Sequence, residues 1–361
     1  MQLQNFNPTT EAPYYYACHF PILHDKLLSK GSLSVLSLIA NDQLYSLPSL
    51  CVDSEKSLSS VAWYVPLLNH KENIFSFINR PYTHFEEGLE DIKECIKRGE
   101  FFIASGTTYY LPYSKDYKNP KYIRSHTNNK HDKYVTDHYL AIYGMTQDEI
   151  LIHDPVPHKF MGPIAINEFE EFWRGNKSIP EFSSVKGIEK LNNYGTLDVT
   201  FKEIITQKNI KDCFITILKS VSKEFMKGTI VSKTKKTYYF GVAASEILKE
   251  NINQTGFESS NSLQMYSKCL FDMRWSKYFL HDLIKDMSDI VGPSFTSFLN
   301  ESEEIIKMWE NVSKFCQVNL GKSGVNEEDI QFVNQSLTNI IEKEQEFHEK
   351  ILTTFESPVY Y

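Results

Sequence analysis

Residues 137–157, DHYLAIYGMTQDEILIHDPVP, contain two strand-like runs on either side of a short turn. Both runs are rich in β-branched and aromatic residues, and Thr146-Gln147-Asp148 between them is typical of a hairpin. Before them, His84–Arg98 has the spacing of an amphipathic helix and leads into FFIASGTTYYL (101–111), a run typical of a buried strand. A helix followed by buried strands and a hairpin predicts an α+β fold.

This hairpin predicts a close pair of a histidine and an aspartate. With the turn centred near Thr146, residues whose numbers sum to about 292 lie opposite one another, so His138 faces Asp154 with Cβ atoms roughly 4.5–5.5 Å apart. A carboxylate at that distance fixes the imidazole tautomer and stabilises the imidazolium. A register shift of one residue places His153 opposite His138 instead. Such a pair is also common as a purely structural contact.

Cys18 is the candidate nucleophile. Apolar residues recur at helical spacing after it and end at Gly31, so the thiol lies where a helix begins. The N–H groups of a helix N-terminus and a nearby histidine lower a thiol pKa, and the same N–H groups can bind an oxyanion. A cysteine at a helix start can also be a simple packing residue. The other five cysteines, which we expect to be packing residues, are Cys51, Cys95, Cys213, Cys269 and Cys316.

Composition excludes several classes of protein. The chain has 361 residues, of which 41% are hydrophobic and 23% charged, as in globular proteins of about two domains. A formal net charge of −8 argues against a nucleic-acid-binding protein. The sequence has no apolar run long enough for a membrane span and no signal-peptide pattern at its start, so we expect a cytoplasmic protein without a membrane partner.

The composition changes between about Pro180 and Thr196, which predicts domains at residues 1–185 and 196–361. The second domain is expected to be all-α. Residues 110–134 are polar and contain two prolines, and they form either a lid over a site or a surface insertion. The helices expected in the second domain are Ile204–Lys223, Tyr238–Asn251, Leu263–Ile290, Ser297–Asn319 and Glu327–Phe355.

The order of a cysteine that opens a helix, a histidine that opens a strand and Asp-Pro after the next strand resembles papain-like enzymes of the bacteriocin-processing C39 type. The chain is more similar to the butirosin biosynthesis protein H family. The resemblance rests on six stretches, which are distributed over most of the chain: ACHFPILHDKLLSKG (17–31), GTTYYLPYSKDY (106–117), residues 137–157, YYFGVAASEIL (238–248), RWSKYFLHDLI (274–284) and MWENVSKF (308–315).

This resemblance implies a papain-like cysteine-protease fold followed by an all-α helical domain. It also implies an acyltransferase of antibiotic biosynthesis that moves an acyl group from a carrier-protein thioester to a small amine and forms an amide without ATP. Closthioamide assembly uses such an enzyme. The implied catalytic residues are Cys18, His138 and Asp154. The implied partner is an acyl or peptidyl carrier protein, and no cofactor is expected beyond the phosphopantetheine of the carrier-bound substrate.

One position departs from the papain-like pattern. The glutamine of the oxyanion hole, about six residues before the cysteine, is replaced by Ala12. The expected donor is then the backbone N–H of Cys18, either alone or together with a tyrosine hydroxyl. Two alternatives remain open at this point: a thiol protease or amidase of the same fold, and a non-catalytic binding module.

The sequence contains two further groups of polar residues between positions 115 and 137. Lys115, Lys118, Lys121 and Arg124 form either a carrier docking patch or a solvated charge run. No metal is expected, because His126 and His131 near Asp132 and Asp137 lack ligand spacing.

Overall fold

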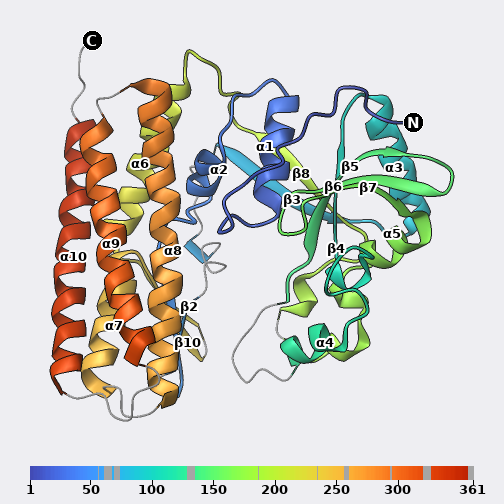
Figure 1. The fold of residues 1–361 in the computed structure, drawn as a ribbon. Helices are drawn as coiled ribbons and strands as arrows, with labels where there is room; N and C mark the ends of the chain where they lie inside the picture. The colour runs from blue at the N-terminus through green and yellow to red at the C-terminus, as the bar shows by residue number, and fades with distance from the viewer. Residues whose placement is uncertain are drawn as a thin grey trace. The chain divides into compact units, whose positions relative to one another are not determined.

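The computed structural model describes residues 1–55, 57–60, 67–68, 74–127, 135–185, 187–233, 235–255, 260–292, 295–319 and 327–356. Helices and strands are mixed in it, with two antiparallel sheets and a helical C-terminal region, so the α+β class is confirmed (Figure 1). The chain divides into two units. The first unit consists of Met1–Leu36 and Phe75–Ile204, and the second of Ser37–Ile74 and Ile205–Tyr361.

A six-stranded antiparallel sheet forms the centre of the first unit. The DHYLAIYGM and EILIHDPVP runs supply two adjacent strands of it, as the sequence predicted. In sheet order, the strands are β3 (Phe75–Pro81), β8 (Gly195–Phe201), β4 (Phe102–Gly106), β5 (His138–Met145), β6 (Glu149–Asp154) and β7 (Phe160–Ala165).

Helices lie on both faces of β5 (Figure 1). On one face, Leu140 and Ile142 pack in an apolar core with Ile92 of α3 (Phe85–Lys97) and Phe169 of α5 (Ile166–Trp173). On the other face lies α1 (His19–Ser29). Successive strand residues point to opposite faces, and helices cover both faces of β5. The strand is therefore apolar on both sides. The remaining short helices of this unit are α4 (Pro120–Thr127), η2 (Thr108–Tyr110), η3 (Asn176–Ser178), η4 (Pro180–Phe182) and η5 (Ile188–Lys190).

The second unit combines long helices with a four-stranded antiparallel sheet. The sheet order is β2 (Leu58–Ser60), β1 (Ser49–Asp53), β10 (Lys236–Phe240) and β9 (Ile230–Lys233). No helix in the described part of the chain is both long enough and apolar enough to cross a bilayer. The helices are α2 (Leu36–Asp42), α6 (Ile210–Lys227), α7 (Val242–Thr255), α8 (Ser260–Val291), α9 (Thr296–Asn319) and α10 (Glu327–Glu356).

This division differs from the sequence-based boundary, which kept residues 1–185 together. Ser37–Ile74 belongs to the second unit because β1 pairs along its whole length with β10, from Ser49 opposite Phe240 to Asp53 opposite Lys236. The second unit is therefore not all-α. The expected helix Tyr238–Asn251 is strand up to Phe240 and helix only from Val242.

Candidate active site

The β5–β6 hairpin brings His138 and Asp154 together, but not directly opposite each other as the sequence analysis expected. The observed register pairs Ala141 with His153 and Ile142 with Ile152, and it shifts at a bulge before Gly144. Extended to the strand ends, this register places Asp154 beside Leu140. His138 lies on the same face two residues away, which is a diagonal neighbour that a long side chain can reach. Nε2 of His138 lies 2.9 Å from Oδ2 of Asp154.

The carboxylate of Asp154 is fully buried and has two partners on one oxygen. Oδ2 accepts a hydrogen bond from the Tyr113 hydroxyl at 3.0 Å in addition to its bond with His138. Burial by itself lowers the pKa of His138, but the negative charges of Cys18 and Asp154 outweigh it and raise this pKa to about 10. His138 is therefore an imidazolium at neutral pH.

Cys18 is the N-cap residue of α1 and is partly exposed. Burial raises the pKa of its thiol, but the charge of His138 and hydrogen bonds with His138 and His19 lower it to about 6. Since Nε2 of His138 faces Asp154, the other ring nitrogen, Nδ1, is the one left for the thiol. The structure thus brings Cys18, His138 and Asp154 together as a thiolate, an imidazolium and a carboxylate in series.

A second pair of rings lies beside this series. The ring of His19, next to Cys18 in sequence, lies 5.5 Å from the ring of Tyr139, next to His138. Burial and then the nearby charge of Cys18 contribute to raising the pKa of Tyr139 to about 12. Sequence reasoning missed His19 and Tyr113. The only local signal for His19 was its adjacency to the nucleophile.

Contacts of the chain before the helix hold α1 at the sheet. Thr9 donates from its backbone N–H to both carboxylate oxygens of Asp25 at 3.0 Å and from Oγ1 at 2.7 Å. The carbonyl of Thr9 lies 3.1 Å from Nε2 of His153 on β6. Because His153 binds Thr9 on the opposite face from His138, the alternative register with His153 at the site is wrong. These bonds fix the position of Cys18 relative to β5 and β6.

His158 is another histidine at the site that sequence reasoning missed. It lies in the turn between β6 and β7, with its ring 5.7 Å from that of His138 and 5.5 Å from that of Tyr113. Burial lowers its pKa. With His138 and Asp154 it forms a group of potential metal ligands among the described residues.

Two members of the polar group named in the sequence analysis are described, and each has partners of its own. His126 bonds with the Tyr122 carbonyl, and buried Asp137 accepts from the backbone N–H of Asn176. His131 and Asp132 lie outside the described residues.

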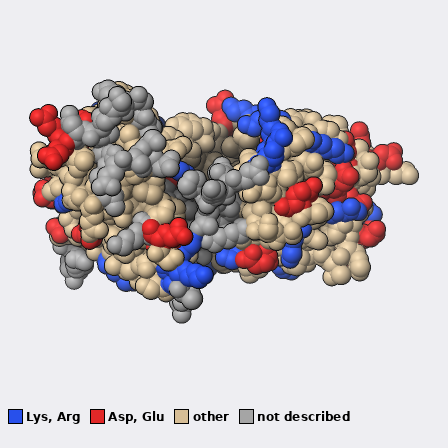
Figure 2. Space-filling model, turned by 90° about the horizontal axis from the view of Figure 1, so that it is seen from below, with Lys and Arg blue, Asp and Glu red and all other residues tan. Residues whose placement is uncertain are grey.

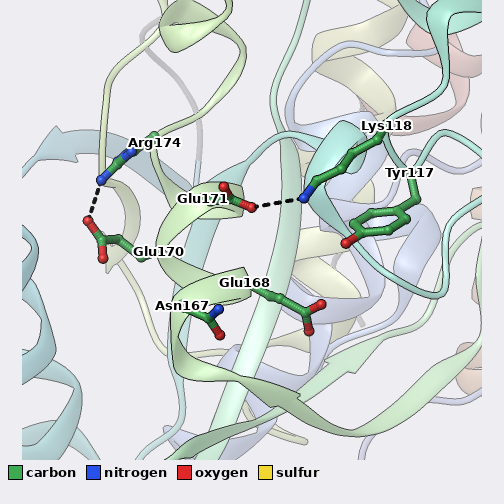
Figure 3. A pocket seen from close by; sticks show the side chains of 7 residues that line it. All are labelled: Tyr117, Lys118, Asn167, Glu168, Glu170, Glu171 and Arg174. Atoms are coloured by element: carbon green, nitrogen blue, oxygen red, sulfur yellow. Dashed lines mark hydrogen bonds and ion pairs between the residues drawn. The ribbon is translucent and has the colours of Figure 1, made fainter.

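The segment expected to form a lid is only partly described, since residues 128–134 lie outside the described ranges. Its described part contains α4 and Tyr113, so it contributes a contact to the site through Asp154. Lys118 lies 3.6 Å from Glu171 of α5, at a polar pocket of about 400 Å³ (Figure 3).

The other three cations of the expected docking patch, Lys115, Lys121 and Arg124, are exposed. Lysine and arginine side chains are interspersed with acidic ones on the first unit (Figure 2). The four cations therefore lie exposed on a surface of mixed charge, and Lys118 is partly neutralised by Glu171.

No family model matches the chain, and a search of the curated proteins gives no match.

Proposed function

We propose that this protein is a cysteine-dependent acyltransferase that moves an acyl group from a carrier-bound thioester to an amine and forms an amide. The observation that carries the proposal is the thiol of Cys18 at a helix N-terminus, with a pKa lowered to about 6 beside His138, which bonds to buried Asp154. Nucleophilic catalysis requires a thiolate that is stable at neutral pH, partly exposed and paired with an imidazolium.

The reaction proceeds in two half-reactions. The Cys18 thiolate attacks the thioester carbonyl and forms a new C–S bond, and the carrier thiol leaves with the proton of His138. A neutral amine then attacks the acyl-enzyme, His138 takes the amine proton, and the C–S bond to Cys18 breaks as the amide forms. The first step exchanges one thioester for another, and the second is downhill, so ATP is not required.

The fold assignment is part of the same proposal. A helix that begins at a cysteine, packed against a sheet whose strands carry a histidine and an aspartate, supports a papain-like arrangement for the first unit. The resemblance to the butirosin biosynthesis protein H family favours an amine over water as acceptor. In this arrangement the backbone N–H of Cys18 donates a hydrogen bond to the oxyanion. It does so without the glutamine side chain of the papain-like pattern, because Ala12 stands at that position.

The test is intact-protein mass spectrometry after incubation with acyl-pantetheine thioesters. Wild type is expected to gain one acyl group on Cys18 and to lose it when an amine is added, with amide appearing in the supernatant. Cys18→Ala should gain none. Cys95→Ala is the matched control, since Cys95 lies in the same unit but is buried in the core with a raised pKa, and it should behave as wild type.

Other outcomes separate the alternatives. An adduct that is released only as free acid, whatever amine is present, would identify a thiol hydrolase. No adduct with any thioester, together with slow alkylation of Cys18 at pH 7, would reject the nucleophile and favour a binding module.

A further inference from the structure

His158 converges on His138 and Asp154, and the acyl-transfer mechanism does not use it. Among the described residues, His138, Asp154 and His158 each offer one potential ligand atom, and these atoms lie within 4.8 Å of one another. They come from the start of β5, the end of β6 and the turn that follows β6. The β6–β7 hairpin, in which Asp154 pairs with Phe160, returns His158 to the vicinity of the carboxylate.

Two polar atoms of this group are buried and have no hydrogen-bond partner among the described residues. Oδ1 of Asp154 accepts no bond from the described part of the chain, although the side chain is fully buried and Oδ2 accepts two. Nε2 of His158 is likewise buried and has no partner within the described ranges. A buried polar atom without a hydrogen-bond partner makes folding less favourable. The unprotonated nitrogen of a neutral imidazole and a carboxylate oxygen are both acceptors, so they cannot satisfy each other. A cation that accepts lone pairs from both atoms would satisfy both.

We propose that His138, Asp154 and His158 form a binding site for a divalent transition metal such as Zn²⁺. Two imidazoles and one carboxylate, with a fourth position open, are the donor set of many zinc sites. Zinc bonds of about 2.0–2.1 Å place tetrahedral ligand atoms about 3.3 Å apart. Nε2 of His138 already lies 2.9 Å from the other oxygen of the Asp154 carboxylate, Oδ2.

Metal binding would inhibit the acyltransferase, a consequence that rests on the proposed function, whereas the site itself does not. The ion takes the place of the proton on Nε2 of His138, and that proton goes to solvent. Nδ1 then keeps its own proton and has no lone pair for the proton of the attacking amine. The step in which His138 acts as a base is therefore blocked while the metal is bound.

The test measures binding directly. Untagged protein is dialysed to equilibrium against Zn²⁺, and in parallel titrated with Co²⁺ while the visible spectrum is recorded. We expect one ion per chain and the intense visible bands of a tetrahedral Co²⁺ site. His158→Asn should weaken affinity at least about tenfold, since losses of outer-shell partners alone already reach that size. His126→Asn is the matched control, because His126 is half-buried on α4 and bonded to a backbone carbonyl, and it should bind as wild type.

Further readouts test the ligand set. Cys18→Ala should keep the Co²⁺ spectrum, because the thiol is not in the group, and the thiolate-to-cobalt charge-transfer band should be absent from wild type. The proposal is overturned if Co²⁺ stays octahedral, if His158→Asn binds as tightly as wild type while its urea midpoint is unchanged, or if Cys18→Ala abolishes binding.

Inhibition is measured separately. Zinc should slow release of the acyl group from Cys18 to the amine at least about tenfold, a chelator should restore the rate, and His158→Asn should be less sensitive. Failure to acylate Cys18 in metal-free buffer would reject the proposed function, while the cobalt spectrum would still decide the metal site.

Discussion

Each unit of the protein buries an ion pair, and the two pairs have different surroundings. In the first unit, His138 bonds with Asp154 at 2.9 Å. In the second, Lys277 of α8 lies 2.5 Å from Glu344 of α10. Trp309 donates to the same carboxylate oxygen at 3.0 Å, and the lysine lies over the rings of Phe225 and Trp309. Both pairs are almost fully removed from water.

The difference lies in what each cation faces. Lys277 contacts aromatic rings and a carboxylate on neighbouring helices. Its charge therefore stabilises the packing of these helices. His138 faces, besides its carboxylate, a partly exposed thiol whose own charge depends on it. A buried ion pair by itself is therefore a structural feature. It becomes a candidate for catalysis when a titratable nucleophile that a substrate can reach depends on the same cation.

The largest expected effect comes from removing the cation of the first unit. His138→Gln leaves Cys18 without its counter-ion, so we expect the rate of acylation to fall by roughly 10³–10⁴-fold. In wild type, the thiolate is lost as pH falls through about 6 and the imidazolium as pH rises through about 10, so acylation should be fast only between these values. The measurement is the pH dependence of acylation and of iodoacetamide alkylation.

In His138→Gln the midpoint of alkylation should move upward, toward the ordinary thiol value of 9.0. His126→Gln provides the control and should keep the wild-type profile. A midpoint that stays near 6 in His138→Gln would show that Cys18 does not depend on His138.

The corresponding change in the second unit should affect stability and leave the thiol unaltered. Glu344→Leu leaves Lys277 buried without a counter-charge, which costs about 3–5 kcal/mol of the free energy of unfolding. The double variant Lys277→Met/Glu344→Leu should recover most of this loss, although Trp309 Nε1 still lacks its acceptor. Urea denaturation measures both.

Alkylation of Cys18 in native buffer should be the same in these variants as in wild type. If the double variant were as unstable as the single one, the pair would not act through its charge. If alkylation changed, the two buried pairs would not be independent.

The sequence predicted the elements of the site better than their register. Helix starts and strands follow local spacing, so α1, β5 and β6 lie where expected. The register depends on a bulge before Gly144, where an added Cβ would lie 2.7 Å from the side chain of Leu151. Pairing residues by their distance from the turn assumes a regular ladder, so it does not include such a bulge. The pairing of His138 with Asp154 was still correct in kind, because the shift is by an even number of residues and preserves the face.

Contacts between residues distant in sequence could not be predicted in the same way. The pairing of β1 with β10 joins segments almost two hundred residues apart and has no local sequence pattern. The sequence analysis therefore kept Ser37–Ile74 in the first domain, whereas the structure places this segment in the second unit. His158 and Tyr113 reach the site through a turn and through the segment after η2, where side-chain direction depends on packing. Single-sequence periodicity contains no information about such directions.

The smallest expected effect tests whether Tyr113 positions the pair in the first unit. Tyr113→Phe removes a hydrogen bond of 3.0 Å to Oδ2 of Asp154 and keeps the ring stacked on Phe160. A hydrogen bond to a charged group contributes about 1.5–3 kcal/mol, of which only the part that orients His138 affects the rate, so we expect a loss of about tenfold in kcat with little change in KM. Without the hydroxyl, the carboxylate attracts the imidazolium more strongly, so the pH above which the rate falls should move upward. A merely structural role of Tyr113 would not produce this shift.

Tyr110→Phe is the control, since Tyr110 lies in the same segment and makes no hydrogen bond to Asp154 among the described contacts. A lower alkaline limit in Tyr113→Phe would mean that the hydroxyl acts by keeping Asp154 charged, and the two buried pairs would then differ in how their carboxylates are held as well as in what their cations face.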